Sequence, residues 1–243
     1  MKLDDFISML ELARNSRTLY VMGCFGAPLN DKNKQRYTTN HPYNQKPERK
    51  RMIMAATSDT FGFDCVNLIK GVLWGWNSSE NLVYGGAKYK SNGVPDVSAD
   101  GMIKLCNKVS TNFSNIERGE AVWMSGHIGI YVGDGKVIEC TPKWSNNVQY
   151  SNLGNIGYTS GNCRFWQKHG FLPWVEYNIS STPETPQNAQ NTSSGDEYYT
   201  IKAGDTFDRI AKAHGLTRAQ LKALNPQITN INKIYAGKKI RVK

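Results

Sequence analysis

The sequence has no apolar run near the roughly 18 residues of a membrane-spanning helix, so we expect no transmembrane segment. Its first fifteen residues, MKLDDFISMLELARN, hold two early acids and no unbroken apolar stretch, and we expect no secretory signal peptide. The cysteines number only five, lie far apart and form no CxxC pair. Free thiols are therefore favoured over a disulfide framework, and at least one thiol is available for chemistry.

Size and charge set the organisation that we expect. The 243 residues, 39% hydrophobic and 11% aromatic, leave room for one large domain and a small one, and they exclude a disordered chain. The net charge is +10, but residues 198–243 alone hold ten Lys and Arg against two Asp, a net charge of +8. A basic C-terminal unit favours a polyanionic partner, such as nucleic acid, an acidic membrane or an anionic cell wall.

Composition divides the chain at about residue 177. Residues 178–196, NISSTPETPQNAQNTSSGD, have the Ser, Thr, Asn, Gln and Pro content of a flexible linker. We predict a large domain over 1–177 and a small domain over 197–243. In the first, a helix over 3–13 precedes strand-like segments over 121–140, and this order predicts an α+β fold. The basic stretch 27–60 fits either an ordered insertion or a solvated loop.

Cys65 is the strongest candidate nucleophile. Asp64 is a good N-cap residue, which would place Cys65 in the first turn of a helix whose apolar face continues to Trp76. The helix dipole and free N–H groups at that position favour a thiolate. The alternative is a buried structural cysteine.

His127 and Glu139 are the residues that would act with this thiol. His127 opens the strand HIGIYV, which supplies a rigid mount for a base. A three-residue loop, Gly133-Asp134-Gly135, would pair Val132 with Lys136 and bring Glu139 onto the face of His127. A two-residue loop would place Glu139 on the opposite face. A carboxylate beside the histidine would fix its tautomer and stabilise the imidazolium; otherwise Glu139 is an exposed strand charge.

Other candidates have weaker patterns. Cys140, Cys163 and His169 match no common zinc spacing, so we expect no metal site and no cofactor. The tryptophans are expected to be core residues rather than a platform for substrate; they include Trp74, Trp76, Trp123 and Trp144.

FDCVNLI followed by SGHIGIYVGDGKVIE resembles the NlpC-type cell-wall cysteine peptidases over about residues 3–145. The resemblance implies a papain-like domain and hydrolysis of an amide in the peptidoglycan stem peptide. Cys65, His127 and Glu139 match the three catalytic positions. Tyr20, in TLYVMGCFG, matches a tyrosine that lines the site, where it would assist the oxyanion or the substrate, or only pack. The family's usual third residue is His rather than Glu, and Met22 and Cys24 replace the common Trp and Gly.

The C-terminal segment YTIKAGDTFDRIAKAHGLT…LNP…I…AGKKIRV resembles a LysM module, with β-α-α-β order over 198–242. We expect Asp205 to cap the first helix and Thr217 to begin a capping box for the second. The resemblance implies binding of N-acetylglucosamine polymers by two loops. Those loops hold Gly204, Asp205, Thr206, Phe207, Pro226, Gln227, Ile228, Thr229 and Asn230. Phe207 fits a core position equally well.

Together these features predict an endolysin-like peptidoglycan hydrolase, made in a host cytoplasm and released onto the wall, or an exported autolysin. The alternatives are an N-acetylmuramoyl-L-alanine amidase with the same nucleophile, a non-catalytic wall-binding protein and a papain-like acyltransferase. Nucleic acid is not expected as a partner, because no aromatic-and-basic stripe or recognition helix is evident.

Overall fold

The chain was analysed as a computed structural model, which describes residues 1–177, 197–202, 205–216, 218–225, 228, 231, 234 and 238–242. It separates into two compact units, residues 1–180 and 181–243. The predicted linker, 178–196, lies outside the described residues, so the predicted domain boundaries stay a prediction. No helix in the described ranges combines the length and apolar character needed to cross a bilayer.

A seven-stranded sheet is the centre of the first unit, and its strands run in the order β4-β10-β5-β6-β7-β8-β9. All neighbours are antiparallel except β8 and β9. The strands are β4 (Asn107–Ser110), β5 (Ala121–Met124), β6 (His127–Gly133), β7 (Lys136–Cys140), β8 (Val148–Leu153), β9 (Cys163–Arg164) and β10 (Lys168–Phe171).

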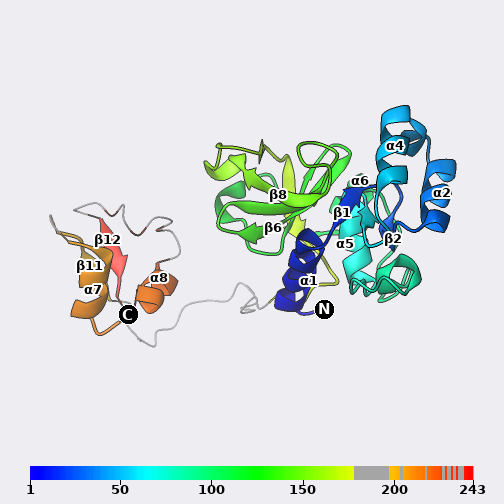
Figure 1. The fold of residues 1–243 in the computed structure, drawn as a ribbon. Coiled ribbons are helices and arrows are strands. Elements are labelled where there is room, and N and C mark those ends of the chain that lie inside the picture. The colour runs from blue at the N-terminus through cyan, green and yellow to red at the C-terminus, as the bar shows by residue number, and fades with distance from the viewer. Residues whose placement is uncertain are drawn as a thin grey trace. The chain divides into compact units, whose positions relative to one another are not determined.

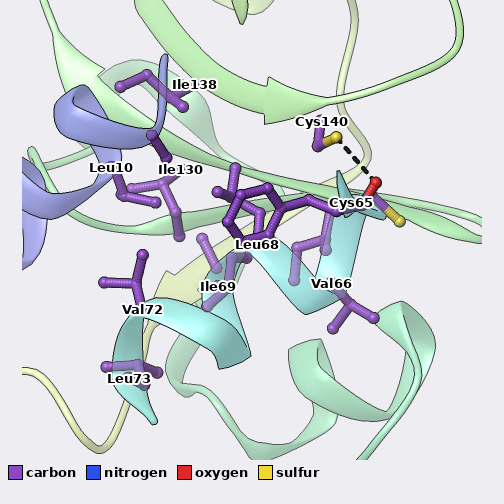
Figure 2. Close-up of a cluster of buried hydrophobic side chains, with 14 of the residues drawn as sticks. Leu10, Cys65, Val66, Leu68, Ile69, Val72, Leu73, Ile130, Ile138 and Cys140 are labelled. Atoms are coloured by element: carbon purple, nitrogen blue, oxygen red, sulfur yellow. Dashed lines mark hydrogen bonds between the residues drawn. The ribbon is translucent and has the colours of Figure 1, made fainter. Parts of the chain in front are cut away.

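Helices α1 (Leu3–Asn15) and α5 (Cys65–Leu73) pack against this sheet (Figure 1). Leu10 of α1 and Ile69 and Val72 of α5 are fully buried, and they meet Ile130 and Ile138 of the sheet in one core (Figure 2). Trp74 and Trp76 belong to the same core and are 1% exposed, as predicted. The α+β organisation predicted from the sequence is confirmed.

A second, three-stranded sheet lies beside α5 and has the order β1-β3-β2. Its strands are β1 (Thr18–Tyr20), β2 (Phe25–Pro28) and β3 (Phe61–Phe63). Strand β3 ends one residue before Asp64, which is the N-cap of α5 as predicted: its carboxylate accepts a hydrogen bond from the Asn67 N–H at 2.8 Å. The strand and the cap together fix where Cys65 lies.

The stretch 27–60 is an ordered insertion, not a solvated loop. It forms α2 (Asp31–Asn40), α3 (Pro42–Gln45) and α4 (Pro47–Ala55) beyond the three-stranded sheet (Figure 1). Proline stands at the start of both α3 and α4, where its fixed φ suits a helix and its missing N–H is not needed. Tyr37 and Ile53 from these helices pack on Val21 and Leu29, which attaches the insertion to the sheet.

The remaining helices of the first unit are short. They are α6 (Ala99–Leu105), η1 (Val83–Gly86), η2 (Phe113–Asn115) and η3 (Gly154–Ile156).

The second unit has β11 (Tyr198–Thr200), α7 (Phe207–Ala213), α8 (Arg218–Leu224) and β12 (Lys239–Arg241), with the two strands antiparallel. Asn225, fully buried, accepts from the Arg241 N–H at 2.8 Å and donates to the Leu221 carbonyl at 2.9 Å. One amide side chain therefore joins α8 to β12. This is the β-α-α-β order predicted from the sequence.

Candidate active site

Helix α5 places Cys65 at its first residue, with the thiol 7% exposed and 4.0 Å from the Gly126 carbonyl oxygen. Gly126 immediately precedes His127, the first residue of β6. Helix α5 and strand β6 thus bring the two predicted residues to one place, although they are 62 positions apart in sequence. In the described chain no hydrogen bond joins the Cys65 thiol to the His127 ring.

The balance of effects at Cys65 favours the thiol rather than the predicted thiolate. Burial, and then the charge of Asp64, raise the pKa of Cys65 to about 12, while nearby backbone N–H groups, including those of Ile128 and Val66, lower it only in part. The helix start acts in the predicted direction, but its effect is smaller than that of desolvation.

His127 and Glu139 are in direct contact: the histidine Nε2 lies 2.6 Å from a Glu139 carboxylate oxygen. The Glu139 side chain is completely buried rather than exposed. Burial raises the pKa of Glu139, but the hydrogen bond with His127, the electrostatic effect of that ring and the charge of Arg164 outweigh burial, and the net pKa is lowered. An ionised carboxylate only accepts hydrogen bonds, so Nε2 carries the proton and Nδ1 is left as the basic nitrogen.

The loop of the β6–β7 hairpin is shorter than the sequence predicted, although the placement of Glu139 beside His127 agrees with the prediction. Gly133, not Val132, pairs with Lys136, so the loop is the two-residue Asp134-Gly135 turn, with φ of 49° and 70°. Such a turn alone would reverse the face of Glu139. A bulge between Tyr131 and Gly133 absorbs one residue, and the predicted pairing of Ile130 with Ile138 is restored. Asp and Gly both tolerate positive φ, which explains the turn.

Gly129 has no side chain and so leaves the space in which the side chains of His127 and Glu139 meet. A Cβ built on it would lie 3.2 Å from the Glu139 Cβ and 2.8 Å from a Val137 methyl carbon. Side chains at this position would displace strand β7, so glycine is required by close approach rather than by backbone angle.

Arg164 belongs to the site and was missed by the sequence analysis. From β9, its Nε donates to both Glu139 oxygens, at 2.9 and 2.7 Å, and its Nη2 donates to the Thr141 hydroxyl at 2.9 Å. The Trp166 ring stacks on His127, with centroids 5.5 Å apart and planes 13° apart. Strand β9 has only two residues, so it shows no periodicity from which the role of Arg164 could be predicted. The segment CRFWQKHG was the only signal in the sequence.

We expect Arg164→Gln to lower kcat about 10- to 100-fold, as loss of a residue that orients a functional group typically does. Without the guanidinium the pKa of Glu139 rises, so the low-pH limb of the activity profile should move to higher pH. Wall-lysis rates across pH measure both effects. A purely structural Arg164 would instead reduce activity equally at every pH.

Tyr20 ends β1 and is 6% exposed. Burial is the main cause of the raised pKa of Tyr20, and the neighbouring Cys65 and Asp64 raise it further. Its ring meets Tyr43 of the insertion edge to face at 6.0 Å, and the Arg49 guanidinium lies 5.6 Å from it. The insertion therefore supports the tyrosine side of the site.

The remaining cysteines and histidine have other partners. All five cysteines are free thiols, as predicted. Cys140 donates to the Phe63 carbonyl at 3.2 Å (Figure 2). His169, buried, contacts Glu120 at 2.6 Å and the Asn112 carbonyl at 2.9 Å.

The predicted glycan-binding residues of the second unit are only partly described. Phe207 is 3% exposed and belongs to the core of this unit with Ile210 and Leu221, so the prediction of Phe207 as a glycan contact is corrected to a core residue. The N-cap of α7 is Thr206 rather than Asp205, whose carboxylate accepts from Tyr199 and the Lys202 N–H, both at 2.8 Å. Ile228 is half-buried. The other predictions lie outside the described residues: Gly204, Thr217, Pro226, Gln227, Thr229 and Asn230.

Helix α5 begins at Cys65 and packs on a largely antiparallel sheet, in which strand β6 begins at His127, the partner of Glu139. This is the arrangement implied by the resemblance to NlpC-type domains. For the second unit the class is established directly, because residues 199–243 match the family model "LysM domain". The chain carries a LysM domain at its C-terminus.

Two curated relatives are similar over part of the chain. An endolysin of Bacillus phage B103 is 30% identical over 117 residues, which are 41% of this chain and 43% of the endolysin. A chlorophenol reductase of Desulfitobacterium hafniense is 56% identical over 46 residues, 19% of this chain and 14% of the reductase. The chain thus spans less than half the length of either relative.

Two solved structures are similar at low identity. The P60 domain of a Mycobacterium avium paratuberculosis antigen is 14% identical, with a TM-score of 0.37, covering 70% of this chain and 92% of that domain. RipD of Mycobacterium tuberculosis, described as a non-catalytic NlpC/p60 domain protein adapted to peptidoglycan binding, is 16% identical, with a TM-score of 0.34, covering 62% and 87%.

Proposed function

We propose that this protein is a peptidoglycan hydrolase, a cysteine endopeptidase that cleaves an amide bond in the stem peptide and is anchored to the wall by its LysM domain. One observation carries the proposal: the thiol at the start of α5 lies against the residue that precedes His127, and His127 is bonded to the buried carboxylate of Glu139. A structural cysteine would need no such histidine–carboxylate pair. The similarity to a phage endolysin supports the same class.

In this mechanism His127 acts as a general base. Its Nε2 proton is held by Glu139, and Nδ1 removes the proton of Cys65 as the sulfur attacks the amide carbon. Burial raises the pKa of the Cys65 thiol, which favours proton transfer to His127 as the sulfur attacks over a preformed thiolate–imidazolium pair. Rotation of the thiol toward Nδ1 on substrate binding completes the contact.

The remaining steps return the enzyme to its starting form. Attack forms a carbon–sulfur bond, and the oxyanion accepts from the Cys65 N–H at the helix start, with the Tyr20 hydroxyl beside it. The carbon–nitrogen bond then breaks as His127 gives its proton to the leaving amine. Water hydrolyses the thioester, which releases the acyl fragment and restores the thiol. The residues supply every step, without a cofactor or a metal.

The second unit would hold the enzyme on its insoluble substrate. A LysM domain that binds N-acetylglucosamine polymers raises the local concentration of the tethered catalytic unit at the wall. Its net charge of +8 would aid adsorption to an anionic wall. The proposed site of action is the bacterial wall, reached by a phage enzyme that is made in the host cytoplasm and released at lysis, or by an autolysin that is exported.

An N-acetylmuramoyl-L-alanine amidase would use the same three residues on a different amide. Mass spectrometry of digested sacculi separates the two activities: new free amines within stem peptides are expected for the peptidase, whereas intact stem peptides released from muramic acid would show the amidase. A papain-like acyltransferase would release no soluble fragments.

A further inference from the structure

The turn that joins β7 to β8, residues 141–147, has a strained backbone beside the proposed triad. Trp144 and Asn146 both lie in the left-handed region, with φ of 60° and 57°. For a side chain as bulky as tryptophan this conformation is an outlier. Such residues persist where the surroundings hold them, and they concentrate at ligand-binding and catalytic sites.

Gln149 holds the turn in this shape. It is 7% exposed, and its Nε2 lies within hydrogen-bond distance of the carbonyls of Thr141, Lys143 and Asn147, at 3.4, 3.0 and 3.3 Å. Its Oε1 accepts from the Ser145 N–H at 3.3 Å. One buried side chain thus fixes four positions of the turn before any ligand arrives.

The turn connects the two sides of the site. At one end the Asn146 carbonyl accepts from the Tyr20 N–H at 2.9 Å, and its side-chain oxygen accepts from Arg49 at 2.6 Å. At the other end the Arg164 guanidinium, which holds Glu139, lies 4.8 Å from the centre of the Trp144 ring. Trp144 therefore lies next to the acid side of the proposed triad, and it is only half-buried.

Positive charge surrounds this turn, and only part of it has a carboxylate partner. Lys143 is exposed, and its Nζ lies 4.8 Å from the Trp144 ring. Within the described ranges no carboxylate lies within ion-pair distance of Lys143 or of the buried Arg49, whereas the charge of Arg164 is matched by Glu139. The ring and the lysine together fit a ligand with an apolar part next to an anionic group.

We propose that turn 141–147 binds the peptide part of the substrate, with the Trp144 ring against its apolar portion and the Lys143 ammonium on a free carboxylate. The inference rests on the proposed function and names its preferred substrate class: stem peptides that keep a free carboxylate near the scissile amide, rather than those in which it is amidated.

The test measures binding, so that it does not depend on turnover. Titration calorimetry of the full chain carrying Cys65→Ala would use two synthetic sugar-free stem peptides that differ only in an α-carboxylate or a carboxamide on the second residue. The carboxylate peptide should bind about threefold to fivefold tighter. Lys143→Gln should abolish that preference, and Trp144→Ala should weaken both peptides about tenfold, with Trp144→Phe close to the parent.

Lys168→Gln is the matched control, because Lys168 is also exposed and lies 5.5 Å from a tryptophan ring, that of Trp123. Equal effects of Lys143→Gln and Lys168→Gln, no preference in the parent, or no measurable binding would overturn the inference. Lys143 is a surface residue, so its variant stays informative even if Trp144→Ala unfolds. Failure of the proposed function gives a different result: the parent enzyme would release no products while this binding preference persisted.

Discussion

Cys65→Ala is expected to lower the rate of wall hydrolysis by about 10⁵- to 10⁶-fold, as loss of a nucleophile does in hydrolases of this kind, while wall binding stays at the parent level. In the proposed mechanism the sulfur forms the covalent intermediate, which an alanine side chain cannot form. The LysM domain has its own core of Ile201, Phe207 and Leu221, so retention on the wall does not depend on the catalytic site. Turbidity loss and pull-down with purified sacculi measure the two quantities.

Cys106→Ala is the matched control for this variant. Cys106 is also a buried thiol, 9% exposed, and it donates to the Met102 carbonyl at 3.4 Å, away from His127. The Cys106→Ala variant should lose some stability and keep its full activity. If Cys65→Ala released wall fragments as fast as the parent does, the protein would be a wall-binding protein whose cysteine is structural.

Glu139→Gln should reduce kcat by about 10³- to 10⁴-fold without loss of the fold, the effect seen when a triad carboxylate becomes an amide. The amide can donate to His127 Nε2, which moves the ring proton to Nδ1 and removes the base that Cys65 needs. The change also leaves the Arg164 guanidinium without its anionic partner. Steady-state kinetics, with the folded fraction checked by circular dichroism, measure the loss.

Glu120→Gln separates catalysis from stability. Glu120 is 1% exposed and contacts His169 at 2.6 Å, so the chain offers a second buried glutamate–histidine pair away from the cysteine. Breaking either pair should cost roughly 3–5 kcal/mol of stability, but only Glu139→Gln should lower kcat. Similar losses of kcat in both variants would mean that Glu139 only supports the sheet.

The lowered pKa of Glu139 predicts that the stability of the fold depends on pH. The folded-state pKa of Glu139 is lowered, so its ionised form contributes stability above its unfolded pKa of about 4.3, and that contribution is lost as pH falls through the folded value. The stability difference between the parent and Glu139→Gln should therefore shrink as pH falls below about 4. A difference that stayed constant with pH would contradict the lowered pKa.

The sequence was most informative where a local signal and a long-range one agreed. Asp64 followed by an apolar helical face located α5, and the alternation after His127 located β6, because both patterns report burial on one face. The Asp134-Gly135 dipeptide favours a two-residue turn, but the bulge beside it has no sequence signal. The place of Glu139 was therefore predicted correctly from an incorrect loop length.

Other features depend on contacts that no local pattern encodes. Arg164 lies on a two-residue strand whose position is set by pairing with β8. The thiol pKa was predicted from the helix start alone, whereas burial of the sulfur is the main reason that the pKa is raised rather than lowered. The helices of 27–60 were obscured by their polar composition, although Pro42 and Pro47 mark the starts of two of them.

The central claim is that the His127 ring serves the Cys65 sulfur during attack on an amide. The most direct measurement is a crystal structure of the parent with a stem-peptide aldehyde, which traps the attacking geometry. We expect a hemithioacetal on Cys65, its oxygen at the N–H of the same residue, and His127 Nδ1 within hydrogen-bond distance of the sulfur. An unmodified thiol, with Nδ1 turned away from it and the peptide bound elsewhere, would contradict the account.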